Sequence, residues 1–381
     1  MGGYSADGVG EQFVKAMLQN YNHENIHRYS LVVNSLPKRK NTHGYHTTLH
    51  QAPYSIIPGI ASIQYWRFKN NRLLASLDEI KKIVEQESTD LVWIILNGSL
   101  TIQIGAALHK HIQIPYVAHV WDAPEYLIKK MNLDPFTKKN LINAFAQTMT
   151  YAKRGVVVSE SMGRVFYDRY SISSSSMVLC PPKSSWREVE KVKKENELLI
   201  IFAGSLYAYK EWNSFLDAIE KYNNVNRKIK IKVTCIGNTS RWTKKKEWVN
   251  YEPVKPIDEA ANAVSKADIA YLPYWMDKSH SLFVKTAFPG KMSFYVSSGT
   301  PVFFHGPEDS TPTQFLQKYK VGKVCHSKKT EDIINTIEDI LSSDFQNQYK
   351  QSQKETLEAV FHPDRCVEIF EETIRLTLKP S

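Results

Sequence analysis

The sequence predicts an α/β protein with two Rossmann-like domains, each built around a mainly parallel sheet. Its 381 residues exceed one ordinary core and fit two domains of roughly 150–200 residues each. Short apolar runs alternate with amphipathic stretches of helical period, which is the pattern of parallel βα units. A segment rich in Ser, Pro and charge interrupts this alternation once, and the alternation then restarts. We therefore expect one domain on each side of the interruption.

In the first half, four apolar runs are expected to form strands, at residues 30–34, 90–96, 115–121 and 155–159. Amphipathic stretches separate them. The stretch over 70–88 should turn one apolar face inward, made of Leu74, Leu77, Ile80 and Val84. The stretch over 140–154 repeats this spacing with Leu141, Phe145 and Met149.

The interruption covers 171–176 and 180–196, which we expect to be loop and linker. After it, strands are expected at 197–205, 230–237, 268–274, 300–306 and 321–327, and an amphipathic helix closes the chain over 363–378. The predicted division is a first domain over 1–182, a linker over 183–196, a second domain over 197–360 and a C-terminal helix over 361–381.

The composition is that of a globular protein, with 42% hydrophobic and 23% charged residues. The four cysteines are far apart and form no CxxC pair, so we expect buried free thiols in a reducing cytoplasm. The polar, Gly-rich start is not a signal-peptide pattern, and no apolar stretch approaches the ~20 residues of a membrane span.

The net charge of +10 favours phosphate-bearing partners, which include nucleotides, anionic lipid head groups and nucleic acid. The positive residues form short clusters, at 37–40, 128–130 and 243–248, as solvated surfaces usually do. No helix-turn-helix or zinc pattern supports nucleic-acid binding, which we therefore do not expect. We expect a cytoplasmic protein, with peripheral contact at the inner, anionic face of a membrane as a further expectation.

Ligands of open parallel sheets bind beyond the carboxyl ends of the strands, so the loops at those ends are the candidate sites. The first candidate is the Gly-rich start, where Gly8 and Gly10 permit close backbone approach to a ligand. It is not a GxGxxG pattern, and a flexible terminus is the alternative. A doubly wound domain normally opens with a strand, so either a strand precedes this segment or the first domain is built differently.

Two further candidate loops lie in the second half. In "FAGSLYAYKEW", a strand and a Gly-Ser turn lead to Lys210 near a helix start, where a lysine can meet a diphosphate. In "FPGKMSFYVSSGTPV", Pro289 and Gly290 lead into a short helix that Gly299 ends, and Pro301 opens the next strand. The alternatives are a surface lysine and a purely structural turn.

These two segments resemble the GT-B glycosyltransferases, particularly the retaining family 4 type. "FAGSLYAYKEW" is similar to that family's strand, glycine turn and donor-phosphate lysine, and "FPGKMSFYVSSGTPV" is similar to its FPxKxxEYxxxGxPV segment. "IPYVAHVWDAP" resembles its first-domain strand ending in His-Asp, and the helix from Pro363 resembles the one that crosses back to the first domain. The resemblance is strongest over 197–306. It implies two domains that face each other across a cleft, with the nucleotide-sugar donor on the second.

The resemblance implies roles for particular residues. Diphosphate binding falls to Lys210, Ser205, Gly290 and Lys291, with Gly8 and Gly10 approaching the donor from the first domain. The nucleotide base and ribose fall to Gly237, Asn238, Ser293 and Glu308. Asp122 matches the acidic position near the acceptor, and either it or His119 could polarise an acceptor hydroxyl, although His119 also fits a core histidine. Aromatic residues of the first domain are candidate sugar platforms, among them Tyr54, Tyr65, Trp66, Trp121 and Tyr126.

The sequence departs from the family at three positions. The family's two glutamates correspond to Thr286 and Phe294, and its usual arginine corresponds to Ser205. Phenylalanine cannot accept the ribose hydrogen bond, so Glu308, Asp309 or Ser293 are the candidate substitutes.

The implied reaction moves a sugar from a nucleoside diphosphate to a glycan, lipid or other acceptor. Positive groups stabilise the leaving diphosphate, so we expect neither a metal nor another cofactor. A catalytically inactive glycan-binding or scaffold protein and a nucleotide-sugar epimerase remain alternatives. A nicotinamide-dependent dehydrogenase would show GxGxxG after a strand, which is not present.

Overall fold

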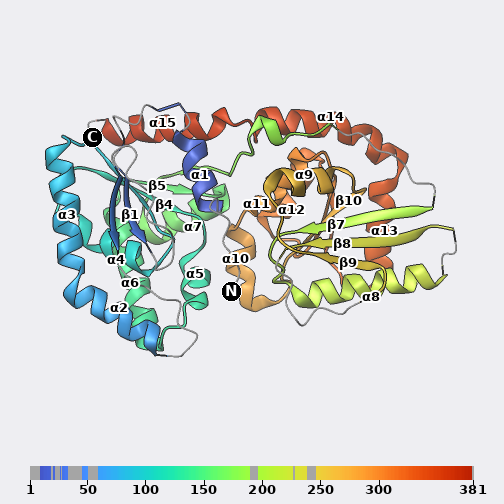
Figure 1. The fold of residues 1–381 in the computed structure, drawn as a ribbon, viewed down its shortest axis with the longest axis horizontal. Helices are drawn as coiled ribbons and strands as arrows, with labels where there is room; N and C mark the ends of the chain where they lie inside the picture. Colours follow the sequence, from blue (N-terminus) through green and yellow to red (C-terminus); the bar gives the residue numbers. More distant parts are fainter. Residues whose placement is uncertain are drawn as a thin grey trace. The chain divides into compact units, whose positions relative to one another are not determined.

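The computed structural model describes residues 9–18, 20–21, 26, 28–32, 45–49, 59–188, 196–225, 228–237 and 246–379 (Figure 1). The chain forms two compact units. Unit 1 comprises Met1–Ala16 and Val178–Cys366, and unit 2 comprises Met17–Met177 and Val367–Ser381. The chain passes between the units at 16/17, 177/178 and 366/367, and the middle boundary lies within the segment that separates the two predicted strand series.

Unit 1 contains a six-stranded parallel sheet with the order β12-β11-β10-β7-β8-β9. Its strands are β7 (Glu197–Ala203), β8 (Lys230–Ile236), β9 (Val249–Glu252), β10 (Ile269–Pro273), β11 (Val302–His305) and β12 (Gly322–Cys325). The five strands expected from the sequence are confirmed, and β9 is an addition. Because the order reverses between β7 and β10, this is a doubly wound sheet with its switch point between those strands.

Helices flank this sheet in Figure 1: α8 (Tyr209–Val225), α9 (Ile257–Ser265), α10 (Ser281–Thr286), α11 (Gly290–Ser297), α12 (Thr311–Tyr319), α13 (Thr330–Leu341) and α14 (Ser343–Ala359). Helix α8 shows why they pack there. Trp212, Phe215 and Ile219 are fully buried at a spacing of three and four residues. The Phe215 ring stacks on Tyr271 of β10, with centroids 4.0 Å apart.

Unit 2 contains the parallel sheet β3-β4-β5-β6 and a separate parallel pair, β1 and β2. The strands are β1 (Arg28–Val32), β2 (Tyr45–Leu49), β3 (Val92–Ile95), β4 (Tyr116–Val120), β5 (Arg154–Val157) and β6 (Ser174–Ser176). The four expected strands are confirmed. The helices are α2 (Ile60–Asn71), α3 (Leu73–Gln86), α4 (Ser99–Leu108), α5 (Pro124–Lys130), α6 (Pro135–Tyr151) and α7 (Glu160–Tyr170), while α1 (Val9–Leu18) begins in unit 1.

Two expectations for unit 2 are wrong. The segment 171–176 is not only loop, because it contains β6, which pairs with β5. A Cβ on Gly155 would lie 2.4 Å from Ser174 Oγ, so small residues permit this close pairing. The apolar face predicted over 70–88 is incomplete: α3 begins at Leu73 and buries Leu77, but leaves Leu74 64% exposed.

The last helix, α15 (Asp364–Leu378), starts in unit 1 and continues in unit 2 from Val367. In unit 2 the Phe370 ring lies 4.8 Å from Trp93, centroid to centroid. The four cysteines are buried free thiols, as predicted. Within the described ranges, no helix combines the length and apolarity needed to cross a bilayer.

Candidate functional site

The switch point of unit 1 positions the candidate site. The carboxyl ends of β7 and β10 diverge there, which opens room for a ligand at that edge of the sheet. The loop after β7 begins with Gly204 and leads into α8, and the loop after β10 runs from Tyr274 to His280. Both loops were candidates by position, but sequence analysis singled out only the first.

Two glycines, one after β7 and one after β8, allow the backbones at the ends of these strands to pack closely together. Gly204 has φ +122° and Gly237 has φ +132°, values that side-chain-bearing residues rarely adopt. A Cβ on Gly237 would lie 2.3 Å from the carbonyl oxygen of Gly204. The N–H of Gly204 donates to Ile236 O at 2.8 Å. Gly237 is thus required for a tight turn beside the candidate site.

The side chain of Lys291 lies across the Gly204 turn. A Cβ on Gly204 would lie 2.6 Å from Lys291 Cε and 3.3 Å from Nζ. The ammonium lies 5.0 Å from the ring centroid of Tyr207, within cation–π range. Ser205 follows directly and is exposed. The structure therefore brings together three predicted residues: Ser205, Gly237 and Lys291.

Helix α11 is anchored to the end of β7 by one buried hydroxyl. Tyr295 is fully buried; its O–H donates to Ala203 O at 3.2 Å and accepts from Ala203 N–H at 2.9 Å. This link holds the start of α11 at the same edge of the sheet. Gly290, its first residue, is exposed, and a Cβ there would meet only Leu179, at 4.0 Å. The first N–H groups of α11 have no intrahelical acceptor, so they suit an anion.

Lys210 is exposed on the first turn of α8 and acts on the loop after β10. The pKa of Asp277 is lowered, chiefly by a hydrogen bond from the Ser279 hydroxyl, and further by His280 and by the charge of Lys210. His280 Nδ1 lies 2.8 Å from the Asp277 carboxylate. The charge of Lys210 therefore acts on the loop after β10, which leaves the sheet beside the switch point, and its role in phosphate binding stays a prediction.

An aromatic cluster, made of Tyr207, Trp275 and His280, spans the ends of β7 and β10. Trp275 stacks on His280 with centroids 4.1 Å apart and planes 10° apart, and its ring lies 4.6 Å from that of Tyr207. The cluster links Lys291, over Tyr207, to Asp277. Sequence analysis missed it, although the strand-end rule applied to "LPYWMDKSH" would have indicated it.

A buried carboxylate was also missed. Glu211 is 1% exposed; its Oε1 accepts from Met276 N–H at 3.1 Å and lies 2.9 Å from the ammonium of Lys328. Nearby, burial lowers the pKa of His305 to about 4, so the ring is neutral. Its Nε2–H donates to Ser327 O at 2.9 Å, which leaves Nδ1 to accept from the Tyr271 hydroxyl at 2.6 Å.

The remaining predicted donor residues are placed less favourably. Ser293 is buried, and its hydroxyl donates to Gly290 O at 3.1 Å, so it faces its own helix. Glu308 is exposed in the loop after β11, whereas its neighbour Asp309 pairs with Lys285 at 2.7 Å. Gly10 lies in α1, and Gly8 and Asn238 lie outside the described residues.

In unit 2, His119 lies on β4 and is fully buried. The indole N–H groups of Trp93 and Trp121 approach its Nδ1 and Nε2, at 3.3 and 3.1 Å. Burial lowers the pKa of His119 to about 3. A neutral imidazole has a single acceptor nitrogen, so only one indole donates at a time. This environment is that of a core histidine, the alternative weighed for it.

Asp122 follows β4 at its carboxyl end, before α5. Burial raises the pKa of its carboxyl group, and the charge of Lys130 opposes that rise. The Lys130 ammonium lies 3.7 Å from the ring centroid of Tyr126. A carboxylate with a raised pKa is a better proton acceptor, which suits a general base.

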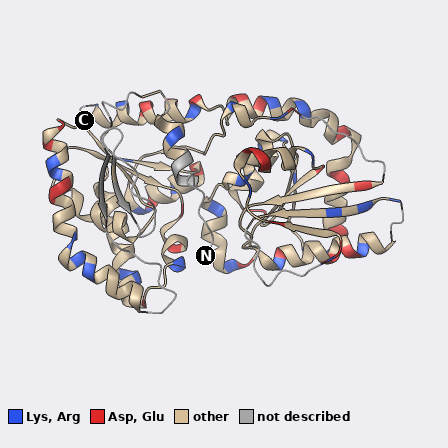
Figure 2. Ribbon diagram, in the orientation of Figure 1, with Lys and Arg blue, Asp and Glu red and all other residues tan. Residues whose placement is uncertain are grey.

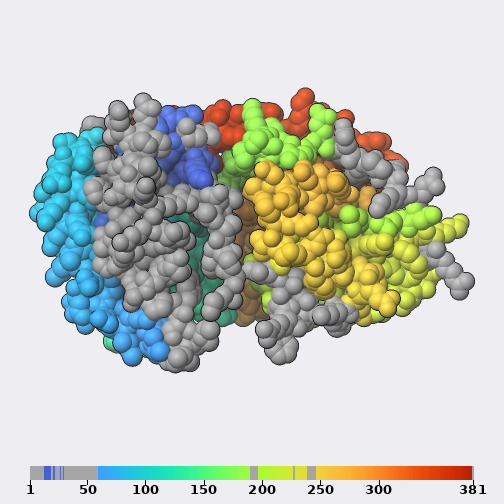
Figure 3. Space-filling view, viewed as in Figure 1, coloured from blue at the N-terminus to red at the C-terminus, as the bar shows by residue number. Residues whose placement is uncertain are grey.

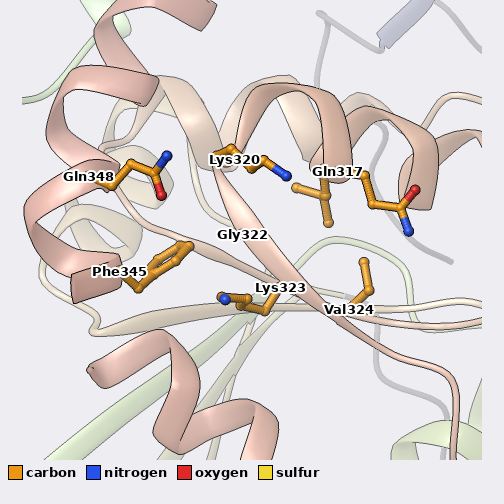
Figure 4. A pocket seen from close by; sticks show the side chains of 8 residues that line it. Gln317, Lys320, Gly322, Lys323, Val324, Phe345 and Gln348 are labelled. Carbon is orange, nitrogen blue, oxygen red and sulfur yellow. The ribbon is translucent and has the colours of Figure 1, made fainter. Parts of the chain in front are cut away.

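A small pocket lies elsewhere in unit 1, between α12, β12 and α14 (Figure 4). Lys320, Lys323 and Phe345 are among its lining residues. It opens near Gly322, at the amino end of β12, and contains none of the predicted site residues. Among the described residues, no group of three or more His, Cys, Asp or Glu side chains could hold a metal ion.

The fold and this edge of unit 1 define a two-domain, doubly wound α/β protein with an anion-suited switch point. No protein-family model and no curated protein matches the sequence. Solved structures do match. Sucrose-phosphate synthase from Thermosynechococcus elongatus has a TM-score of 0.67 at 11% identity, over 96% of this chain and 92% of that one. A trehalose-6-phosphate synthase studied with bisubstrate glycomimetics has a TM-score of 0.66 at 10% identity, over 99% of this chain and 98% of that one. Anabaena HepE in complex with UDP has a TM-score of 0.63 at 11% identity, over 98% of this chain and 97% of that one. The chain therefore has the GT-B fold, as predicted.

Proposed function

We propose that this protein is a glycosyltransferase that moves a sugar from a nucleoside-diphosphate donor to a glycan, lipid or other acceptor. The observation that carries the proposal is the convergence of Lys210, Lys291 and the Gly204 turn at the switch point of unit 1. The fold supports it, because similar structures include a complex with UDP and synthases of trehalose and sucrose phosphates.

A series of contacts joins Asp277 to Lys291, and the charge of Lys210 acts on Asp277. Lys210 acts on Asp277, which lies 2.8 Å from His280; His280 stacks on Trp275; and Trp275 contacts Tyr207, below the Lys291 ammonium. Both cations therefore belong to one edge of the sheet. Two ammonium groups and the start of α11 offer positive charge from separate elements, which is what a diphosphate requires.

The proposed chemistry is electrostatic. As the bond between the sugar and the diphosphate breaks, negative charge grows on the leaving phosphate oxygen. Lys210, Lys291 and the N–H groups at Gly290 and Lys291 would stabilise that charge without a metal ion. Asp122 of unit 2 would take the proton of the acceptor hydroxyl. Retention at the anomeric carbon belongs to the proposal as an expectation from the family resemblance.

A second candidate is a catalytically inactive glycan-binding or scaffold protein with the same fold. Phe294 and Thr286 favour it, because neither offers a carboxylate to a nucleotide-sugar donor. The Thr286 hydroxyl donates to Leu282 O at 2.7 Å and is already used within its helix. If this candidate holds, no sugar is transferred.

Calorimetry with UDP, GDP and ADP tests the donor site. We expect binding of at least one nucleotide, weakened at least tenfold by Lys210→Ala and by Lys291→Ala, since each removes one charged hydrogen bond. Lys266→Ala, an exposed lysine on the loop after α9, is the matched control and should bind normally. Failure of all three nucleotides to bind would refute the transferase. Binding without hydrolysis or transfer from any of a panel of nucleotide sugars would leave only the second candidate.

A further inference from the structure

A patch of exposed apolar side chains lies on unit 2, where α2 meets the start of α6. Ile63 is 67% exposed and Phe136 is 69% exposed, although both are large hydrophobic residues. The Trp66 ring stacks on Phe136, with centroids 5.8 Å apart and planes 19° apart. Ile63 and Trp66 are three residues apart, so they share one face of α2. We call Ile63, Trp66, Phe136 and the cations described below the α2–α6 surface.

The outward position of these residues is built into the local structure. Helix α2 buries Ser62, Tyr65 and Phe68, so its core-facing stripe lies beside the exposed one. The Asp134 carboxylate caps α6 by accepting from Phe136 N–H at 2.9 Å, and Asp134 N–H donates to Ser62 Oγ at 2.9 Å. The Trp66 indole N–H donates to Thr137 Oγ1 at 3.0 Å. Phe136 is thus held on the first turn of a capped helix that is tied to α2.

The α2–α6 surface is strongly basic. Residues 59–72 and 134–140 carry five cations and one carboxylate, a net charge of +4. The single carboxylate, Asp134, is occupied in the helix cap. No described residue forms an ion pair with any of the five cations, which are Arg67, Lys69, Arg72, Lys138 and Lys139. Lys69 lies 4.9 Å from the Trp66 ring centroid, so charge and aromatic surface are contiguous.

The figures place α2 on the outside of unit 2. Helix α2 carries blue segments for its Lys and Arg in Figure 2. Figure 3 shows the light-blue atoms of α2 at the molecular surface. Exposed apolar residues on two segments that also carry five cations fit a partner that is apolar within and anionic at its surface.

We infer that the α2–α6 surface docks this protein onto a bilayer that contains anionic phospholipid. Ile63, Trp66 and Phe136 enter the boundary between head groups and acyl chains, where aromatic rings are favoured. The five cations lie at the level of the lipid phosphates, with their aliphatic stems along the apolar side chains. In a dimer formed through this face, two surfaces with a net charge of +4 each would meet, so charge repulsion disfavours such a dimer. The inference does not depend on the proposed transferase activity.

Vesicle sedimentation with the full-length protein tests it. We expect binding to vesicles of phosphatidylcholine with 30% phosphatidylglycerol, and little to phosphatidylcholine alone. Because each basic residue near an anionic surface contributes about fivefold to partitioning, Arg67→Gln with Lys139→Gln should weaken binding about 25-fold. Ile63→Ser with Phe136→Ser should weaken it at least tenfold. The matched controls are exposed residues of unit 1, Lys266→Gln with Lys354→Gln and Val225→Ser with Val254→Ser, which should bind as the wild type does.

A second measurement locates the contact. Phospholipid brominated on its acyl chains should quench tryptophan fluorescence, and Trp66→Phe should remove much of that quenching. Absence of binding to the anionic vesicles, or equal binding by the α2–α6 variants and the wild type, would overturn the inference. Nucleotide calorimetry on the same variants separates this result from the proposed function, since the α2–α6 substitutions should leave nucleotide binding unchanged.

Discussion

Replacing Tyr295 by phenylalanine removes one oxygen atom, yet it should cost more than a typical single substitution. β10 pairs with β7 only at Ile200 and Ile201. The N–H of Gly204 faces β8, so the N–H and C=O of Ala203 face the opposite side, beyond the last pair with β10. The Tyr295 hydroxyl bonds both groups there. Tyr295→Phe therefore leaves a buried donor and a buried acceptor without a partner.

The expected cost follows from these two groups. A buried backbone group that loses its partner costs about 1–3 kcal/mol, and partial relaxation lowers the sum, so we expect a loss of about 2–3 kcal/mol. For a domain of about 150–250 residues each kcal/mol shifts the melting temperature by about 2–4 °C, which gives a fall of about 4–12 °C by calorimetry. Nucleotide binding should weaken too, because this bond holds the start of α11 beside Gly204.

Tyr349 provides the matched control in the same unit. It is also fully buried, but its hydroxyl has no hydrogen-bond partner among the described residues. Tyr349→Phe removes an unsatisfied polar atom, so the melting temperature should stay unchanged or rise slightly. If both variants lost the same stability, the cost would belong to generic repacking and not to the Ala203 link, and the reasoning would be refuted.

Three further predictions test the sites and the core. Gly237→Ala should destabilise by about 2–4 kcal/mol in urea unfolding, because it adds backbone strain and a contact of 2.3 Å to Gly204 O. Gly290→Ala adds only an ordinary contact of 4.0 Å to Leu179, so it should change stability by less than about 1 kcal/mol. His119 and His305 have pKa values lowered to about 3 and about 4. Below about pH 6.5, the unfolded chain therefore binds protons at these histidines that the folded chain does not bind. The free energy of unfolding should be constant above about pH 7 and fall below pH 6.5 by up to about 1.4 kcal/mol per pH unit for each histidine, and His305→Gln should reduce that slope. Asp122→Asn should lower transferase turnover by about 10²-fold or more while leaving nucleotide affinity unchanged; an active variant would exclude Asp122 as the base.

The sequence predicted the strand series and the second-domain loops well, because their signals are local. Buried parallel strands appear as continuous apolar runs, such as the one that became β7. The end of α11 could also be predicted, because Gly299 has φ +75°, a value that glycine adopts without strain. Gly237 and Lys291 were named from the family resemblance, and the structure brings both to Gly204.

What was missed depends on contacts between distant segments. Serine has no strong strand preference, and β6 forms because Gly155 on β5 leaves room for Ser174. The periodicity that assigned Leu74 to the core did not show that the first turn of α3 would leave this side chain exposed. The pairing of Trp275 with Tyr207 joins residues 68 positions apart, which no local pattern encodes.

The order of the segments along the chain has a consequence for synthesis. Unit 2 takes its last helical segment from residues after Val367, where Phe370 lies against Trp93 and the Thr373 hydroxyl donates to Ser175 at 3.0 Å. The ribosome synthesises the whole sheet of unit 1 after Trp93 and Ser175 and before Phe370 and Thr373. At 5–20 residues per second, these roughly 190 residues take on the order of 10–40 s. Throughout that interval, the nascent unit 2 lacks the C-terminal helix segment that packs against Trp93.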